Sequence, residues 1–258
     1  MADRIKISRR RDYREQLRLY LNYTKRINAK LKKLFNKVSI QASRKYLAGF
    51  DIENIFCEEY GNELYSILAN QYTFVIEQTA NRINRQRFRK EIATPEQIIA
   101  TYVSVYTEKE VANISETTRK KIENTIRKGL RDGLTIQQIS KNIKNSSAFA
   151  SSRAPLIART ETHNAMNVGN LEIAKSLELK NPVKEWNNAL DTRARSWHKR
   201  MDGKRVDINE KFIVNTPTKN GVIPIAMSSP GDTAGGPMNV CNCRCFLTFY
   251  DEEDDVIS

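Results

Sequence analysis

Two stretches of this 258-residue chain decide the fold of its C-terminal part: residues 182–203, PVKEWNNALDTRARSWHKRMDG, and residues 241–250, CNCRCFLTFY. Apolar and aromatic residues predict a short strand at residues 183–186 and a longer strand at residues 245–250. Shorter strand candidates lie between them, at residues 205–206 and 212–214. The remaining connection, residues 215–237, holds four prolines and four glycines, which predict an irregular loop.

A short helix is predicted at residues 191–201, and the glycine at position 203 is well placed to end it. Four polar residues follow one another along this helix at spacings that share one face: Asp191, Arg195, His198 and Asp202. A carboxylate beside a histidine can act as a general acid or base, and it can equally belong to a salt-bridged framework. The spacing leaves both interpretations open.

Three cysteines alternate in the segment CNCRC. On a regular strand, Cys241, Cys243 and Cys245 would point to the same side. Thiolates and the imidazole of His198 are soft ligands that suit zinc, with Asp191 or Cys241 as a fourth ligand. The spacing differs from that of a zinc ribbon, which has two CxxC pairs. Zinc is therefore a candidate cofactor, and packing thiols or a disulfide are open alternatives.

A helix upstream of these stretches carries a third group of polar residues. It is predicted from Pro155 to about residue 177 and contains Arg-Thr-Glu-Thr-His-Asn at residues 159–164. Residues four apart share a helix face, so Arg159 lies with His163. Such a surface can bind a ligand, or it can form a network that ties the helix to the C-terminal module. The network is the favoured interpretation, because buried polar clusters more often specify packing than catalysis.

The first 150 residues predict helices. Between residues 13 and 38, apolar side chains recur at alternating spacings of four and three, as in a heptad seam. The seam consists of Tyr13, Leu17, Tyr20, Thr24, Ile27, Leu31, Leu34 and Val38. It packs either against helices of the same chain, which is slightly favoured, or against a partner helix. Further on, Thr94-Pro95 predicts a helix start and Thr135 a helix cap, with separate helices ending near residue 111 and spanning residues 115–130.

The predicted fold class is therefore α+β and predominantly helical, with an N-terminal helical region followed by a small loop-rich module. We expect a basic helical region at residues 1–150, the α+β module at residues 151–250 and an acidic tail at residues 251–258. No run of about 18 apolar residues predicts a membrane span, and no apolar segment follows the basic N-terminus, as a secretion signal would require.

The net charge of +13 arises almost entirely at the N-terminus. Residues 1–46 carry 15 Lys and Arg against 3 Asp and Glu, whereas the rest of the chain is nearly balanced. Such an asymmetry favours a polyanion or an acidic protein surface as partner, although a solvated helix face explains it equally well. The candidate residues for binding nucleic acid or a partner are Arg9, Arg10, Arg11, Arg14, Arg18, Lys32 and Lys33.

Taken in order, IARTETHNAMNVGN, KEWNNALDTRARSWHKRMDG, the stretch rich in proline and glycine, and NCRC resemble the phage head morphogenesis family, the Mu F-like minor head proteins. The matching positions are Arg159, Thr160, Glu161, Asn164, Trp186, Asp191, Arg193, Arg195, His198, Asp202, Gly203, Asn242, Cys243, Arg244 and Cys245. Cys241 lies outside the family motif. The resemblance covers about residues 150–250, and the preceding residues match only in being helical and basic.

The resemblance implies a minor structural and assembly protein of a tailed-phage head rather than an enzyme. Such proteins associate with the portal vertex, enter the procapsid, and influence DNA packaging or ejection. The implied partners are the portal protein and, beyond it, the scaffold, the major capsid protein and packaged DNA, with no membrane. The implied location is the virion, assembled in the host cytoplasm.

We assign no catalytic residue and expect the polar motif residues to form a structural network. That network comprises Arg159, Thr160, Glu161, Asn164, Trp186, Asp191, Arg193, Arg195, His198 and Asp202. Two alternatives stay open. One is a metal-dependent hydrolase or nuclease that uses His163 and His198 with nearby carboxylates, or His198 with the cysteine cluster. The other is a non-specific DNA-binding protein that uses the basic N-terminal residues.

Overall fold

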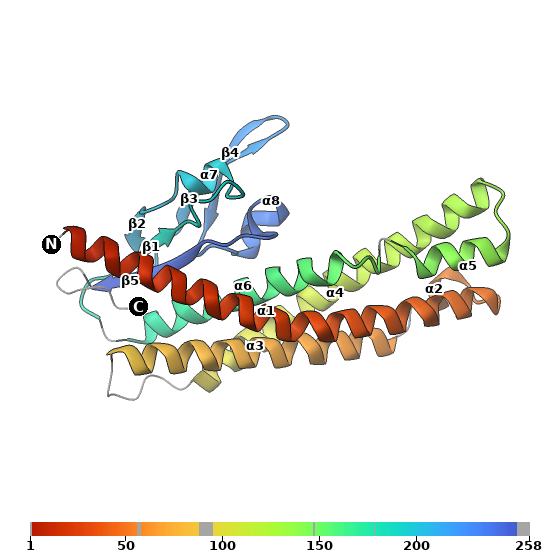
Figure 1. The fold of residues 1–258 in the computed structure, drawn as a ribbon, viewed down its shortest axis with the longest axis horizontal. Coiled ribbons are helices and arrows are strands. Elements are labelled where there is room, and N and C mark those ends of the chain that lie inside the picture. Colours follow the sequence, from red (N-terminus) through yellow and green to blue (C-terminus); the bar gives the residue numbers. More distant parts are fainter. Residues whose placement is uncertain (1, 56–57, 88–94, 147, 178, 252–258) are drawn as a thin grey trace. The chain divides into compact units, whose positions relative to one another are not determined.

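The computed structural model describes residues 2–55, 58–87, 95–146, 148–177 and 179–251 (Figure 1). The fold is α+β and predominantly helical, as predicted. The chain divides into two compact units, each assembled from segments that are distant in sequence. Unit 1 comprises residues 1–23, 72–101 and 159–258, and unit 2 comprises residues 24–71 and 102–158.

Long helices make up most of the chain. They are α1 (Ala2–Leu47), α3 (Glu58–Arg87), α4 (Pro95–Arg131), α5 (Ile136–Lys144) and α6 (Arg153–Ser176). The short helices are α2 (Ile52–Ile55), α7 (Ser196–Lys199), the 3-10 helix η1 (Thr233–Gly235) and α8 (Gly236–Val240). Among the described residues, none of these helices combines the length and apolar character needed to cross a membrane.

Unit 2 is helical, and its core is built from aliphatic side chains of α1, α4 and α5. The core includes Ala42, Ile55, Ile122, Ile126, Ile139, Ile143 and Ala148. Thr135 caps α5 as predicted, because its hydroxyl accepts from the Gln138 backbone while the Gln138 side chain accepts from the Thr135 backbone. The predicted division of residues 95–130 into two helices is wrong, since α4 is continuous. No Gly or Pro interrupts residues 96–128, and Ile114 is buried within the helix.

The predicted apolar seam of α1 is confirmed as core within its own chain. Tyr13 and Tyr20 are buried in unit 1. The other buried seam residues belong to unit 2 and are Ile27, Leu31, Leu34 and Val38. Leu17 and Thr24 are half-buried. The seam therefore serves intramolecular packing in both units, and a partner helix is not needed to cover it.

Unit 1 contains the predicted strands. The strand β1 (Pro182–Asn187) lies between β2 (Arg205–Asp207) and β5 (Phe246–Asp251), and both neighbours pair with it in the antiparallel sense. Every residue of β5 is buried. A core cluster around Trp186 packs against this sheet and includes Leu171, Met201, Phe212, Val214, Met227, Cys243, Cys245, Leu247 and Phe249.

The predicted irregular loop at residues 215–237 is partly wrong, because it contains a β-hairpin. The strand β3 (Phe212–Thr218) pairs with β4 (Gly221–Met227) through seven registered positions, from Phe212 opposite Met227 to Thr218 opposite Gly221. Proline counts against strands in a sequence, yet this sheet has two strands only, so both are edge strands, where a missing N–H is tolerated.

Two predictions concern residues outside the described part. Thr94, the predicted cap before α4, is one of them, although α4 does begin at Pro95 as expected. The acidic tail is described only at Asp251, whose carboxylate accepts from the backbone N–H groups of Lys180 and Asn181.

Candidate metal centre

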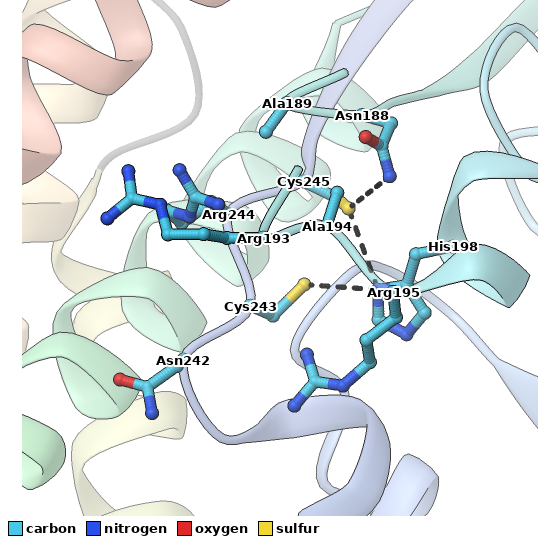
Figure 2. A pocket seen from close by; sticks show the side chains of 10 residues that line it. All are labelled: Asn188, Ala189, Arg193, Ala194, Arg195, His198, Asn242, Cys243, Arg244 and Cys245. Atoms are coloured by element: carbon cyan, nitrogen blue, oxygen red, sulfur yellow. Dashed lines mark hydrogen bonds between the residues drawn. The ribbon is translucent and has the colours of Figure 1, made fainter. Parts of the chain in front are cut away.

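A small pocket in unit 1 gathers residues from both stretches that decide the C-terminal fold (Figure 2). It is lined by Asn188, Ala189, Arg193, Ala194, Arg195, His198, Asn242, Cys243, Arg244 and Cys245. Its free volume is about 10 Å³, which is room for roughly one water-sized ligand. Three of the lining residues are arginines, and one of them, Arg244, is paired with Asp191.

The segment that supplies one wall of this pocket is not the predicted helix. Only Ser196–Lys199 is helical, as α7, and Arg195 before it is extended, with φ −60° and ψ 139°. The helix does not extend back to Asp191, because the Asp191 carboxylate accepts from the Arg193 backbone N–H at 3.0 Å and closes a turn. The predicted common face of Asp191, Arg195, His198 and Asp202 is therefore wrong.

The cysteines do not lie on a strand either, since β5 starts at Phe246. Asn242 adopts φ +56°, and the Cys243 N–H donates to the Val240 carbonyl at 3.1 Å, so CNCRC is a turn. Cys241 closes α8, and its carbonyl accepts from Arg195 at 2.6 Å. The turn brings Cys243 and Cys245 together, whereas Cys241 is only half-buried and lies outside their group.

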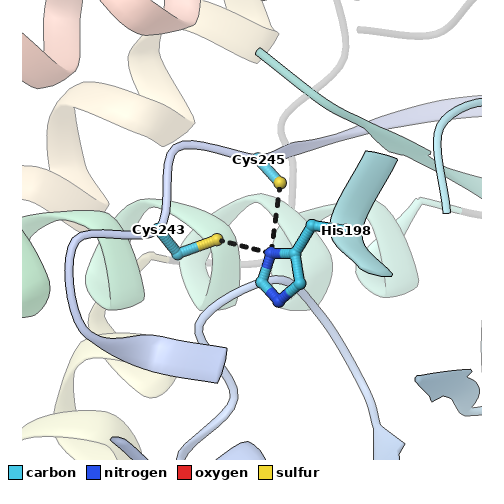
Figure 3. A group of neighbouring side chains, drawn as sticks. All are labelled: His198, Cys243 and Cys245. Atoms are coloured by element: carbon cyan, nitrogen blue, oxygen red, sulfur yellow. Dashed lines mark hydrogen bonds between the residues drawn. The ribbon is translucent and has the colours of Figure 1, made fainter. Parts of the chain in front are cut away.

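Three side chains converge at this turn (Figure 3). The sulfur atoms of Cys243 and Cys245 each lie 3.6 Å from Nδ1 of His198. The three atoms lie within 4.8 Å of one another, and all three residues are buried. Among the described residues, this is the group of histidine, cysteine and carboxylate side chains that could hold a metal ion.

The hydrogen bond made by Nε2 of His198 determines whether Nδ1 carries a proton. Nε2 lies 3.1 Å from Oδ1 of Asn239. The Asn239 amide has a defined orientation, because its oxygen accepts from the Trp197 indole at 2.8 Å while its nitrogen donates to the Gly235 carbonyl at 2.9 Å. Nε2 of His198 must therefore donate, which leaves the lone pair of Nδ1 facing the two sulfurs.

The thiols of Cys243 and Cys245 influence each other's pKa. Burial alone would raise the pKa of Cys243, yet the Cys245 thiol and the two neighbouring histidines, His163 and His198, hold it well below its usual value. Burial and the adjacent Cys243 raise the pKa of Cys245 well above its usual value. Nδ2 of Asn188 lies 3.6 Å from the Cys245 sulfur and donates toward it. The pKa values of the two thiols are thus shifted in opposite directions, because the thiols interact with each other.

The helix α6 holds this turn through its backbone. Nε2 of His163 donates to the Cys245 carbonyl at 2.7 Å. Asn167 donates to the same carbonyl at 3.2 Å and accepts from the Leu247 N–H. Nearer the start of the helix, Arg159 donates to the Asn242 side chain at 2.7 Å. These contacts fix the position of the turn relative to α6.

Other motif residues of α6 are also engaged with protein groups. Tyr72 donates to the Glu161 carboxylate at 2.6 Å. Asn164, in the amide orientation that suits its neighbours, donates to the Gly231 and Thr160 carbonyls. Gly231 has φ +86°, and a β-carbon there would lie 2.7 Å from Nδ1 of His163, so the position requires glycine.

The acidic motif residues form ion pairs. Asp191 accepts from both terminal nitrogens of Arg244, at 2.5 and 2.8 Å, and this lowers the pKa of Asp191 to about 2. Asp202 accepts from Arg9 and Arg10, and Arg9 also donates to Glu185 at 2.9 Å. Neither acid faces an open site as a general base would.

These ion pairs involve two of the basic residues predicted to bind a partner. Arg9 and Arg10 are half-buried, and both pair with acidic residues of unit 1. The exposed candidates are Arg11, Arg14 and Arg18 in unit 1, and Lys32 and Lys33 in unit 2. The candidate binding surface is therefore narrower than the charge count indicated.

Several residues that build the site had no signal in the sequence. Asn239 and Asn188 are single amides in segments without recognisable periodicity, and only the folded turn shows that they contact ligand-type atoms. A buried network behind β5 was also missed. In it, Arg82 donates to Asp12 at 2.7 Å and to Asn170 at 3.0 Å.

Comparison with known proteins identifies a family. The sequence profile described as "Phage Mu protein F like protein" matches residues 120–248. The chain is 30% identical over 129 residues to the minor head protein GP7 of Bacillus phage SPP1, covering 50% of this chain and 39% of that protein. It is 29% identical over 127 residues to the NAD(+)–arginine ADP-ribosyltransferase EFV of Enterococcus faecalis, covering 48% of this chain and 24% of that protein.

The chain thus spans less than half the length of both relatives. No solved structure matches it. The matched region contains α6, α7, the sheet strands β1 and β2, the hairpin and the CNCRC turn. It therefore includes every residue that lines the pocket and the group of His198, Cys243 and Cys245.

Proposed function

Because the chain belongs to the family of phage Mu protein F like proteins, we propose that it is a minor structural and assembly component of a tailed-phage head. The observation that carries the proposal is the match over residues 120–248 together with the 30% identity to a minor head protein. The geometry of the site supports it, because Arg159, His163 and Asn167 of α6 bind the CNCRC turn, Arg159 through the Asn242 side chain and the other two through the Cys245 carbonyl. Such a framework gives a rigid module, which an assembly protein needs.

We place the protein in the virion and procapsid, with the portal protein as its main partner. The scaffold, the major capsid protein and packaged DNA are further candidate partners. The surface we assign to these contacts is the exposed basic face of α1, formed by Arg11, Arg14 and Arg18. These positions are three and four residues apart and therefore project from one side of the helix. An acidic protein surface or DNA phosphates would complement them.

We assign no enzymatic role to this chain. The similarity to an ADP-ribosyltransferase covers only 24% of that protein. Within the described residues, the carboxylates nearest the pocket are engaged, Asp191 with Arg244 and Asp202 with Arg9 and Arg10. A two-metal nuclease needs clustered carboxylates that remain open to metal ions, and the paired acids here do not supply that arrangement.

The location is tested by mass spectrometry of purified procapsids and virions from cells that make the full phage. We expect this chain in the procapsid at few copies relative to the major capsid protein. Its absence from both particles would refute the proposal.

The portal contact is tested by co-purification of the full-length chain with the portal protein. We expect the triple charge reversal Arg11→Glu, Arg14→Glu and Arg18→Glu to reduce the amount of portal retained. A matched control reverses three exposed basic residues of α4, Arg127, Lys128 and Arg131, and should retain it. Equal retention by both variants would exclude the α1 surface.

DNA as the partner of the same surface is distinguished by salt dependence. Each phosphate contact contributes a slope of about −0.9 to log K against log salt concentration for double-stranded DNA. If Arg11, Arg14 and Arg18 contact phosphates, their reversal should flatten the slope by about 2.7, and the α4 control should leave it unchanged. Identical slopes would show that α1 does not contact DNA.

A further inference from the structure

The separations between Nδ1 of His198 and the sulfurs of Cys243 and Cys245 match those around a tetrahedral ion. Zinc binds sulfur at about 2.3 Å and histidine nitrogen at about 2.0–2.1 Å, so a tetrahedral angle places the two ligand atoms about 3.6 Å apart. Both observed distances between sulfur and Nδ1 are 3.6 Å. A thiol–imidazole hydrogen bond explains one such distance, but Nδ1 has a single lone pair and two sulfurs face it.

The groups around these atoms hold them in position through hydrogen bonds. A histidine that binds metal through one nitrogen usually donates its other N–H to an oxygen, which sets the tautomer. His198 does so toward Asn239, whose own amide is held by Trp197, Gly235 and Thr216. The Cys245 sulfur has Asn188 as a neighbouring N–H donor. These contacts position the ligand atoms before any ion arrives.

We propose that His198 Nδ1, Cys243 Sγ and Cys245 Sγ bind one zinc ion. Two thiolates, one neutral imidazole and Zn²⁺ together carry no net charge, which suits a buried site. The sulfur and imidazole ligands select zinc over calcium or magnesium, which require oxygen.

The fourth coordination position belongs to a water-sized ligand in the pocket of Figure 2. His198, Cys243 and Cys245 all line that pocket, and its free volume of about 10 Å³ admits one such ligand. Cys241 is not a ligand, since it lies outside the group that the other two cysteines form with His198. This distinguishes the proposed site from one in which all three cysteines of CNCRC bind.

The ion would join two segments that are otherwise linked through side chains alone. One is α7, which carries His198, and the other is the turn before β5, which carries the cysteines. A metal that binds the folded form and not the unfolded chain stabilises the fold by RT ln(1 + [L]/Kd), where [L] is the concentration of free metal. The inference concerns a structural ion and is independent of the role in the phage head.

The test is the metal content of the full-length chain, purified without chelator and measured by inductively coupled plasma mass spectrometry. We expect one zinc per wild-type chain. Cys243→Ser, Cys245→Ser and His198→Ala should each reduce the zinc content to a small fraction. The matched control is Cys241→Ser, which changes a neighbouring cysteine of the same motif and should retain one zinc. Wild-type content near zero, or full content in Cys243→Ser, would overturn the proposal.

A second measurement keeps the test decisive if a ligand variant does not fold. Wild-type protein is stripped with a chelator, refilled with Co²⁺ alone, and examined by absorption spectroscopy. Two thiolates and one imidazole around cobalt should give sulfur-to-metal charge-transfer bands and the intense visible bands of a tetrahedral ion. Titration with a mercurial reagent should then release the ion as two thiols react. Octahedral-type weak bands, or release that requires no thiol modification, would refute sulfur ligation.

Discussion

The buried ion pair between Asp12 and Arg82 gives the sharpest test of how unit 1 is held together. Nη1 of Arg82 lies 2.7 Å from Oδ1 of Asp12, and the two side chains are 6% and 5% exposed. Truncating one member of a buried pair leaves the other charge without compensation and costs about 3–5 kcal/mol. The hydrogen bonds that remain decide where in that range each substitution falls.

In Arg82→Ala, the Asp12 carboxylate keeps two donors, Gln16 at 2.6 Å and Thr248 at 3.1 Å. In Asp12→Ala, the buried guanidinium keeps the Asn170 oxygen as its hydrogen-bond partner at 3.0 Å. Since hydrogen bonds to charged groups contribute about 1.5–3 kcal/mol each, we expect about 3 kcal/mol for Arg82→Ala and about 4–5 kcal/mol for Asp12→Ala. The double variant should cost less than the sum, because the two residues interact directly.

Urea unfolding followed by tryptophan fluorescence measures this, because both tryptophans of the chain, Trp186 and Trp197, lie in unit 1. Lys37→Ala is the control, since it breaks the exposed pair with Glu63 in unit 2 and should not move the transition. The reasoning fails if Arg82→Ala changes the free energy of unfolding no more than Lys37→Ala. It also fails if the two single costs add in the double variant.

Three further substitutions test the site. Gly231→Ala should destabilise unit 1 by more than about 1–2 kcal/mol, because φ is +86° and the new methyl group would meet His163, and an unchanged urea midpoint would contradict this. Asn239→Leu should weaken zinc binding about 10–100-fold, because His198 loses the oxygen that accepts from its Nε2. Competition with a chromophoric chelator measures this affinity, and an unchanged affinity would contradict the role of Asn239 in positioning His198. The pKa of Asp191 is lowered to about 2 from an unfolded value near 3.9, so its contribution to stability is present above pH 4 and lost as the pH falls through 2. Between pH 4 and pH 2 the urea midpoint of the wild type should therefore fall more steeply than that of Asp191→Asn, and parallel curves would exclude the effect.

The helical part of the fold could be predicted because periodicity is a local signal. The spacing of Tyr13, Tyr20, Ile27 and Leu34 identifies the buried side of α1, and all four are buried. Strand β5 was also predictable, since it is a short run of mostly apolar and aromatic residues, and the short strand predicted at residues 183–186 lies within β1. The hairpin β3–β4 was not, because its prolines at positions 217 and 224 count against strands unless the strands are known to be edges.

The group of His198, Cys243 and Cys245 was predicted from residue types and not from geometry. A helix over residues 191–201 and a strand through CNCRC were both wrong, yet His198, Cys243 and Cys245 do meet. The predicted helix and strand do not form, because both segments are turns stabilised by side-chain contacts between residues distant in sequence, such as Asp191 with Arg244. Local spacing cannot encode such contacts, so it also offered Cys241 as a fourth ligand, although Cys241 lies outside the group of His198, Cys243 and Cys245.

The polar residues of α6 have a physical explanation that does not require catalysis. A turn buried beside a helix exposes carbonyl and N–H groups that find no strand partner, and each needs a hydrogen bond. His163 and Asn167 supply these bonds to the Cys245 carbonyl, and Asn167 also accepts from the Leu247 N–H. A catalytic side chain needs an atom that faces a substrate, whereas these groups face the backbone of their own chain. The same contacts hold Cys245 where its sulfur meets His198, so the polar face of α6 acts on the proposed zinc site by positioning the turn that carries its ligands.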